Sequence, residues 1–289
     1  MKYLYLILIT ATVMLLPSSC SKQEKPADTN IIFLHHSTGS FLWYGKRASI
    51  ISRAAGVVSE DLRTAIRGKG KIFKYMEAYN KANNTSYYIE EQDFPKSEPY
   101  GWNNFPYDYY NIWVKNGGGE SYMEEPTLEA LTRDYQVVIF KHCFPVSEIE
   151  PDQDVADINS DYKSLSNYKL QYGALRDKLH EFPETRFIVF TGAVNVEARL
   201  SPEEASRTRE FFDWVRNEWD IPGDNIFIWD LYQLQTEGGM YFKNEYAMSE
   251  TNSHPNNKFS TYAGKLLFNR IIDVIENDGE ETLLTGEQK

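Results

Sequence analysis

Cysteine is scarce in this sequence of 289 residues, which contains only Cys20 and Cys143. Cys20 lies in an N-terminal segment that we expect to be separate from the folded domain. Cys143 then stands alone, so no disulfide can form within the domain. The fold must be held together by its core, and the remaining chain is long enough for one sizeable α/β domain.

An excess of positive charge is also missing. The sequence has 30 Lys and Arg residues against 42 Asp and Glu residues, which gives a formal net charge of −12. Nucleic acids and anionic membrane surfaces both attract basic proteins. The charge balance therefore argues against either as a partner.

The sequence lacks a cluster of His and Cys residues with metal-ligand spacing. His35 and His36 are adjacent, but neighbouring side chains of a strand point to opposite faces of the sheet. We therefore expect neither a metal ion nor another cofactor.

No apolar run is long enough for a comfortable membrane span; the run from Tyr3 to Leu16 falls short. It follows the positive Met1-Lys2 pair and precedes Pro17-Ser18-Ser19-Cys20, a small-residue cleavage site ending in cysteine. Residues 1–20 thus resemble a bacterial lipoprotein signal peptide, which implies lipidation of Cys20. Residues 21–30 would be a tether. We expect a lipid-anchored domain at a bacterial cell-envelope membrane, facing the periplasm or the exterior.

Buried strands alternate with amphipathic helices along the rest of the chain. The expected strands are 31–34, 86–90, 136–141, 186–191 and 225–230, and the expected helices begin near 60, 72, 165, 202 and 257. Such alternation predicts an α/β fold with a parallel sheet between two helix layers, a three-layer α/β/α sandwich. We expect one domain over residues 31–278 and a disordered tail over 279–289.

One long irregular stretch, residues 92–125, interrupts the alternation and is rich in Tyr and Trp. Loops of this length in compact domains are usually functional or disordered, and the aromatic content argues against disorder. Two interpretations remain open. The stretch could wall an active-site crevice and stack on sugar rings, or it could form a local aromatic core, which we favour slightly.

The apolar strand 31–34 ends in His35-His36-Ser37-Thr38-Gly39. Ser37 therefore lies at the carboxyl end of a parallel strand, where open α/β sheets bind ligands. Gly39 would allow a tight bend after it. Near the other end of the chain, Ser253-His254-Pro255 precedes the last helix. A serine after the first strand and a His-Pro before the last helix together resemble the SGNH/GDSL hydrolase superfamily, in a divergent His-His-Ser-Thr-Gly form.

The resemblance implies a flavodoxin-like sheet, Ser37 as the nucleophile and His254 as the general base, with Ser37 Oγ within hydrogen-bond reach of the ring. The backbone N–H groups around Ser37 would stabilise the oxyanion. The family's Gly-x-Asn-Asp block is absent after the third strand, where Ser147 is the nearest polar candidate, and Asn195 is a further one. Cys143, flanked by bulky residues, is expected to be buried and inert.

The third member of the triad departs from the family pattern. Thr251 stands three residues before His254, where the family has an aspartate. Asp230 and Glu250 are the candidate acids. Our hypothesis is a Ser37–His254 dyad with a neutral group orienting the imidazole.

These residues predict a serine esterase that hydrolyses an ester, with an acyl group such as acetyl on a small molecule or a glycan. The alternative is a catalytically inactive surface lipoprotein of the same fold that binds glycans, because a fold does not entail an activity.

Overall fold

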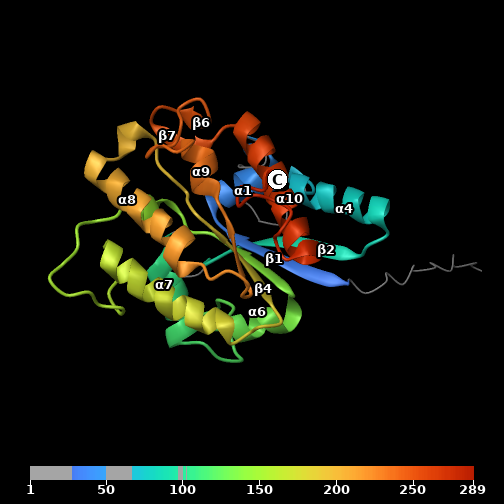
Figure 1. Cartoon of the computed structure of the whole chain (residues 1–289), viewed down its shortest axis with the longest axis horizontal. Helices are drawn as coiled ribbons and strands as arrows, with labels where there is room; N and C mark the ends of the chain where they lie inside the picture. The colour runs from blue at the N-terminus through green and yellow to red at the C-terminus, as the bar shows by residue number, and fades with distance from the viewer. Residues whose placement is uncertain (1–27, 50–66, 97–99, 102) are drawn as a thin grey trace, which may run out of the picture.

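The computed structural model describes residues 28–49, 67–96, 100–101 and 103–289. A five-stranded sheet forms the centre of the molecule, with all of its strands parallel (Figure 1). Its spatial order is β2 (Tyr87–Asp93), β1 (Thr29–His35), β3 (Val137–Phe140), β4 (Arg186–Phe190) and β5 (Ile226–Trp229). This is the flavodoxin-like order 2-1-3-4-5, so the predicted fold class is confirmed.

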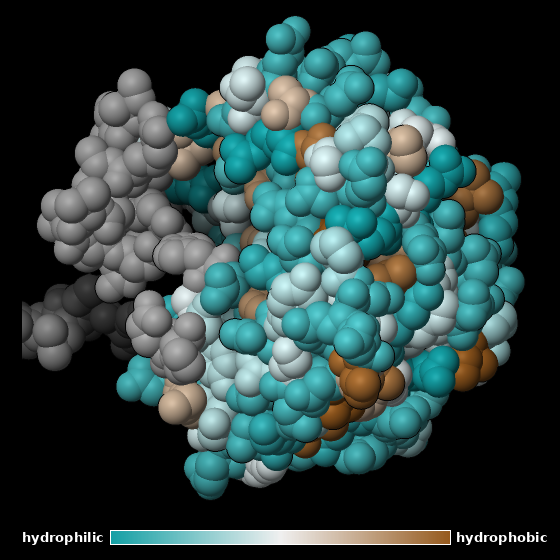
Figure 2. All heavy atoms as spheres, turned by 90° about the vertical axis from the view of Figure 1, so that its left-hand side faces the viewer, coloured by the Kyte–Doolittle hydropathy of each residue, from teal (hydrophilic) through white to brown (hydrophobic). Residues whose placement is uncertain are grey.

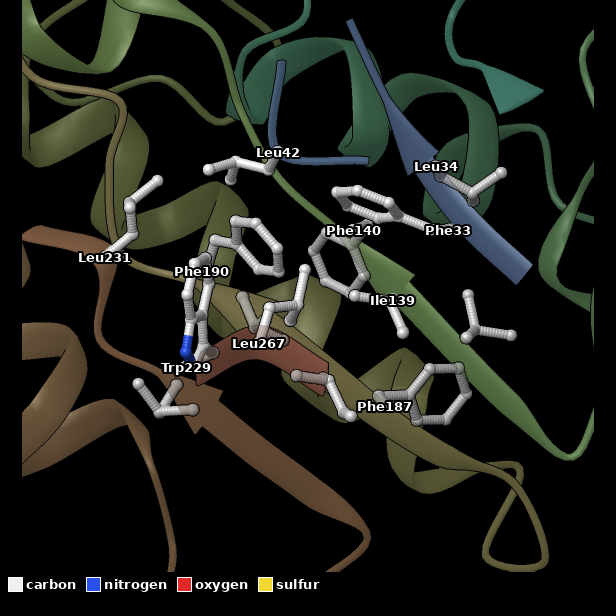
Figure 3. Close-up of a cluster of buried hydrophobic side chains, with 14 of the residues drawn as sticks. Phe33, Leu34, Leu42, Ile139, Phe140, Phe187, Phe190, Trp229, Leu231 and Leu267 are labelled. Carbon is white, nitrogen blue, oxygen red and sulfur yellow. The ribbon is translucent and has the colours of Figure 1, made fainter. Parts of the chain in front are cut away.

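The central strands are apolar on both faces because helices cover both sides of the sheet. All four residues of β3 are buried, as are Ile31 to Leu34 of β1. Figure 3 shows side chains of β1, β3, β4 and β5 packing with Leu42 and Leu267 from two helices. The run of four apolar residues in the sequence therefore forms a buried strand, as predicted.

Two helix layers enclose the sheet (Figure 1). One layer contains α1 (Ser37–Tyr44), α4 (Lys71–Asn83) and α10 (Asn257–Asn277), which contact one another. The other contains α6 (Leu128–Asp134), α7 (Leu165–His180) and α8 (Pro202–Trp214). A π-helical segment (Val215–Trp219) continues α8.

Side-chain caps fix the start of several helices. Ser164 caps α7, Asn256 caps α10, and Ser201 forms a reciprocal capping box with Glu204 at α8. The residues Ser201-Pro202-Glu203-Glu204 match the sequence pattern of such a box.

The aromatic stretch is a folded part of the core. It contains α5 (Pro106–Tyr109) and a π-helical turn (Tyr110–Lys115). Tyr109 and Trp113 are fully buried and pack edge-on against each other, with ring centroids 4.8 Å apart. Of the two interpretations, the local aromatic core agrees with these contacts.

The expectation of a disordered tail at residues 279–289 is wrong. The Asp230 N–H donates to the Leu284 carbonyl at 2.9 Å, and Trp229 Nε1 donates to the Thr285 carbonyl at 3.0 Å. Thr282 is also hydrogen-bonded to the buried Asp273 of α10. The tail covers edge strand β5 and the end of α10. Such tertiary contacts cannot be predicted from a short, mostly polar sequence.

The predicted signal peptide and the helix expected near residue 60 lie outside the described residues. Within the described ranges, none of the helices has the length and apolarity needed to cross a bilayer. The face shown in Figure 2 is mostly hydrophilic, and its hydrophobic residues form small separate groups.

Candidate active site

The sheet order creates a topological switch point between β1 and β3, which run side by side while their chains continue to opposite layers. Ligands of open α/β sheets bind outside the carboxyl ends of the strands at such a point. Ser37 follows β1 there, and Lys141 follows β3. The strand register thus brings two polar positions together that are more than a hundred residues apart in sequence.

Ser37 is the first residue of α1 and is partly exposed. The first N–H groups of a helix have no partner within it. At α1 the N-cap residue is His36, whose side chain makes no capping hydrogen bond. The N–H groups beside the Ser37 hydroxyl therefore point out of the helix as donors suited to an anionic oxygen.

Gly39 has a different role from the one expected. It lies within α1, so it does not form a bend after Ser37. A Cβ atom at this position would come within 2.4 Å of the Cβ atom of His35. Glycine therefore allows the close approach of α1 to the end of β1, which sets the position of Ser37.

His35 and His36 do not share a site. His35 Nε2 pairs with Glu91 Oε2 at 2.8 Å, whereas His36 Nε2 donates to the Pro95 carbonyl. Burial, with a smaller contribution from the charge of Lys141, lowers the pKa of His36 to about 4. The two rings thus brace the β1–α1 junction through different partners.

A short hairpin presents His254 to the same edge. Its strands are β6 (Ala247–Ser249) and β7 (Asn252–Pro255). The imidazole packs against Phe41, with ring centroids 5.3 Å apart, and against Phe144 at 5.5 Å. Phe41 lies four residues after Ser37 on α1, and residues four apart share one helix face. His254 is therefore held on the face of α1 that carries Ser37.

A neutral amide orients the imidazole. His254 Nδ1 lies 2.9 Å from Asn252 Oδ1, which also accepts from the backbone N–H of His254. Because an amide oxygen only accepts, Nδ1 carries the proton and Nε2 keeps its lone pair. Among the described residues, Nε2 has no hydrogen-bond partner. In particular, no hydrogen bond joins the ring to Ser37 Oγ. Such catalytic hydrogen bonds often form only in the substrate complex.

The environment favours the neutral form of His254. Burial is the largest cause that lowers its pKa below 6.5, followed by the positive charges of Lys141, Arg47 and Arg199. A neutral imidazole at neutral pH is the form that a general base requires.

A buried lysine lies beneath this site. Lys141 is fully buried at the end of β3, and its Nζ donates to Cys143 Sγ at 3.4 Å. Cys143 is almost fully buried, as predicted. The neighbouring His142 is also buried, and its burial lowers its pKa well below the ordinary range. The Lys141 charge therefore acts on histidines that remain neutral.

Ser147 and Asn195 hold the loops around His254. The Asn195 N–H donates to Ser147 Oγ at 2.9 Å, and Asn195 Nδ2 donates to Glu148 Oε1 at 3.0 Å. The next residue, Val196, donates its N–H to Ser253 Oγ at 3.1 Å. These hydrogen bonds link the segment after β4 to the hairpin that carries His254. Among the described residues, neither Ser147 nor Asn195 forms a hydrogen bond with Ser37.

Neither candidate acid is bonded to His254 among the described residues. Asp230 accepts from Arg216 at 3.1 Å and from Thr191 at 2.5 Å, and it caps α9 (Leu231–Thr236) through the Gln233 N–H. Glu250 is exposed in the hairpin turn. The residue at the ring is Asn252, which the sequence reasoning missed although it stands two residues before His254.

The described ranges contain no group of three or more His, Cys, Asp or Glu side chains arranged to hold a metal ion. No protein-family model and no curated protein matches the sequence. The chain is similar to a solved structure described as a carbohydrate esterase whose active site displays divergent catalytic and non-catalytic binding functions. The identity is 11% and the TM-score 0.42, over 86% of this chain and 70% of that one. A likeness of this size identifies no activity.

Proposed function

We propose that the protein is a serine ester hydrolase with Ser37 as nucleophile and His254 as general base. One observation carries the proposal: the His254 ring packs on Phe41, one turn from Ser37, with Nδ1 held by Asn252. Nε2 is then the nitrogen available to the serine.

The mechanism uses groups that converge at the start of α1. His254 Nε2 takes the Ser37 proton as Oγ attacks the acyl carbon, and returns it to the leaving alcohol. A water molecule, deprotonated by the same nitrogen, then attacks the acyl–Ser37 ester, which releases the acid and restores Ser37. The free N–H groups at the start of α1 stabilise the tetrahedral oxyanion. Asn252 fixes the tautomer of the ring without supplying a negative charge, so the site acts as a dyad with a neutral orienting partner.

The proposed substrate is an acyl ester, acetyl being the simplest case, on a carbohydrate alcohol. The proposal includes a lipid at Cys20 that anchors the domain outside the cytoplasm of a bacterial cell. The domain would then act on envelope or extracellular glycans.

The second candidate is a non-catalytic glycan-binding lipoprotein of the same fold. Two observations favour it: the partner of His254 is a neutral amide, and no hydrogen bond joins the ring to Ser37 among the described residues. Such a protein would need neither an activated serine nor a base.

Labelling with a serine-directed phosphonate separates the two candidates. An activated serine reacts covalently, so we expect a single adduct on the wild-type protein, located at Ser37 by peptide mass spectrometry. Ser37→Ala should abolish the adduct and His254→Ala should slow it strongly. Ser249→Ala, at an exposed serine of β6, is the matched control and should label normally. An unlabelled, folded wild-type protein would favour the binding candidate.

A further inference from the structure

Two arginine-bearing segments are hydrogen-bonded to residues that precede and follow His254 in the sequence. The Arg47 N–H donates to Asn257 Oδ1 at 2.9 Å, three residues after the histidine. On the other side, the Val196 N–H donates to Ser253 Oγ, immediately before the histidine, and the short helix Glu197–Arg199 follows Val196. The first residue of α10 thus holds the backbone of Arg47, and β7 holds the segment that leads to Arg199, so both charges act on His254.

Both arginines are exposed, and within the described ranges neither guanidinium has an ion pair or a hydrogen-bond partner. By contrast, the partly buried Arg216 pairs with Asp213 and Asp230, and the buried Arg270 pairs with Asp273. The guanidiniums of Arg47 and Arg199 therefore remain available to a ligand.

The charge around His254 has the opposite sign to that of the whole protein. The three charges that act on the ring, those of Lys141, Arg47 and Arg199, are all positive, whereas the chain carries a net charge of −12. A local concentration of one sign in a crevice attracts ligands of the other sign.

The positive region extends beyond Arg47. The next residue back, Lys46, lines a cavity of about 360 Å³ between the end of α1 and the start of α4. Five of its eight lining residues are cationic and none is acidic: Lys46, Arg67, Lys69, Lys71 and Lys74. Lys69 is paired with Glu77 at 2.7 Å, which neutralises one of these charges. The lysines of this cavity extend the positive region from Arg47 along the chain through Lys46.

We propose that the substrate of this site is an anionic ester, in which a carboxylate or sulfate group close to the acylated hydroxyl binds Arg47 and Arg199. The inference deepens the proposed function and rests on it. A guanidinium presents paired N–H donors that match the oxygens of both groups. Lys141 is fully buried and therefore contributes its positive charge without direct contact. The lysine-lined cavity beside Lys46 would accommodate further charged units of an acidic glycan.

The test compares two matched substrates: an acetylated methyl glucuronide with a free carboxylate, and its neutral methyl ester. We expect the wild-type protein to give the higher kcat/KM for deacetylation of the charged compound. Arg47→Gln combined with Arg199→Gln should lower the ratio of the two kcat/KM values about tenfold or more, the effect of losing a charge-assisted contact. Arg133→Gln, an exposed arginine paired with Asp134, should leave this ratio unchanged. Added salt should reduce the ratio in the wild type and not in the double variant.

An acetylated sugar carrying a sulfate in place of the carboxylate identifies the preferred anion, because both groups match a guanidinium. Preference for either compound over the neutral one supports the inference. Equal kcat/KM for charged and neutral esters, or a ratio that survives the double substitution, overturns it.

A binding measurement separates failure of this inference from failure of the proposed function. Calorimetry with an oligogalacturonate and a neutral oligosaccharide requires no catalysis. Binding of only the acidic oligomer, lost in the double variant, would support the anion site even if no ester were hydrolysed. Ester hydrolysis without any preference for charge would support the enzyme and refute the anion site.

Discussion

Two groups of aromatic side chains in the protein have different roles. In the stretch between β2 and α6, Tyr109 and Trp113 are fully buried and pack around Phe94, with ring centroids about 5 Å apart. At the carboxyl edge of the sheet, Phe41 and Phe144 are only partly buried and flank His254. The first group stabilises the fold, and the second shapes the candidate site.

The comparison shows that aromatic density in a sequence indicates burial more readily than binding. The stretch has many aromatic residues, and its Tyr109 and Trp113 side chains fill the core. The site has few, but they stand beside a histidine at the switch point. The two groups differ in their position relative to the carboxyl edge of the sheet. Substitutions at the site should therefore affect catalysis, and substitutions in the aromatic stretch should affect stability.

The largest effect is expected at Ser37. Ser37→Ala should lower kcat for an aryl ester by about a thousandfold or more, because the members of a catalytic unit act together. The free energy of unfolding should change little, since the side chain is partly exposed. Steady-state kinetics and urea denaturation measure the two quantities. Full turnover in the folded variant would exclude Ser37 as the nucleophile.

A substitution in the aromatic stretch should cost a comparable free energy, but in folding stability and not in catalysis. Trp113→Ala removes a fully buried indole whose Nε1 donates to the Pro126 carbonyl at 3.0 Å. It should lower the free energy of unfolding by about 3–5 kcal/mol, with kcat/KM retained by the folded fraction. Met123→Ala, at a half-exposed residue of the same stretch, is the control and should change stability by about 0.5 kcal/mol or less. A loss of activity in the folded Trp113→Ala variant would show that the aromatic stretch contributes to catalysis as well as to stability.

Asn252 should have an intermediate effect. Its side chain holds Nδ1 of His254 but supplies no charge, so Asn252→Ala should reduce kcat/KM about tenfold to a hundredfold, far less than the roughly ten-thousandfold loss when a triad aspartate is amidated. The unfolding free energy should fall only slightly. A loss as large as that of Ser37→Ala would mean that orientation of the ring dominates catalysis.

Asp230→Asn and Glu250→Gln should each reduce kcat/KM less than about tenfold. The large loss seen when a triad aspartate is amidated requires a carboxylate that stabilises the imidazolium, and neither residue is bonded to His254 among the described residues. Asp230→Asn should instead destabilise the fold, since it breaks the Arg216 pair. Kinetics on both variants test the dyad. A loss of several orders of magnitude in either variant would identify a missing acid.

The smallest effect is expected in the pH profile. Since burial lowers the pKa of His254, the acidic limb of kcat/KM, where the base becomes protonated, should lie at lower pH than the limb of an ordinary histidine. Asn252→Asp would place a carboxylate beside the ring, raise this pKa and move the acidic limb to higher pH. An unshifted limb in Asn252→Asp would assign the titration to another group.

The sequence alone determined the architecture. Short apolar runs that alternate with amphipathic helices indicate strands buried on both faces of a parallel sheet. The Ser201 capping box is a local pattern that fixes one helix start. The serine and histidine motifs were equally visible, because each consists of adjacent residues at the end of an element. Local chemistry of this kind needs no knowledge of distant contacts.

Tertiary structure decided what those motifs contact. The amide of Asn252 at His254, the buried Lys141 below it and the two arginines around it come together from four separate segments of the chain. The ordered tail over β5 depends on the same kind of distant contact. Periodicity and spacing report which face a residue occupies and not which residue it meets. The fold was therefore readable from the sequence, whereas the electrostatics of the candidate site required the folded chain.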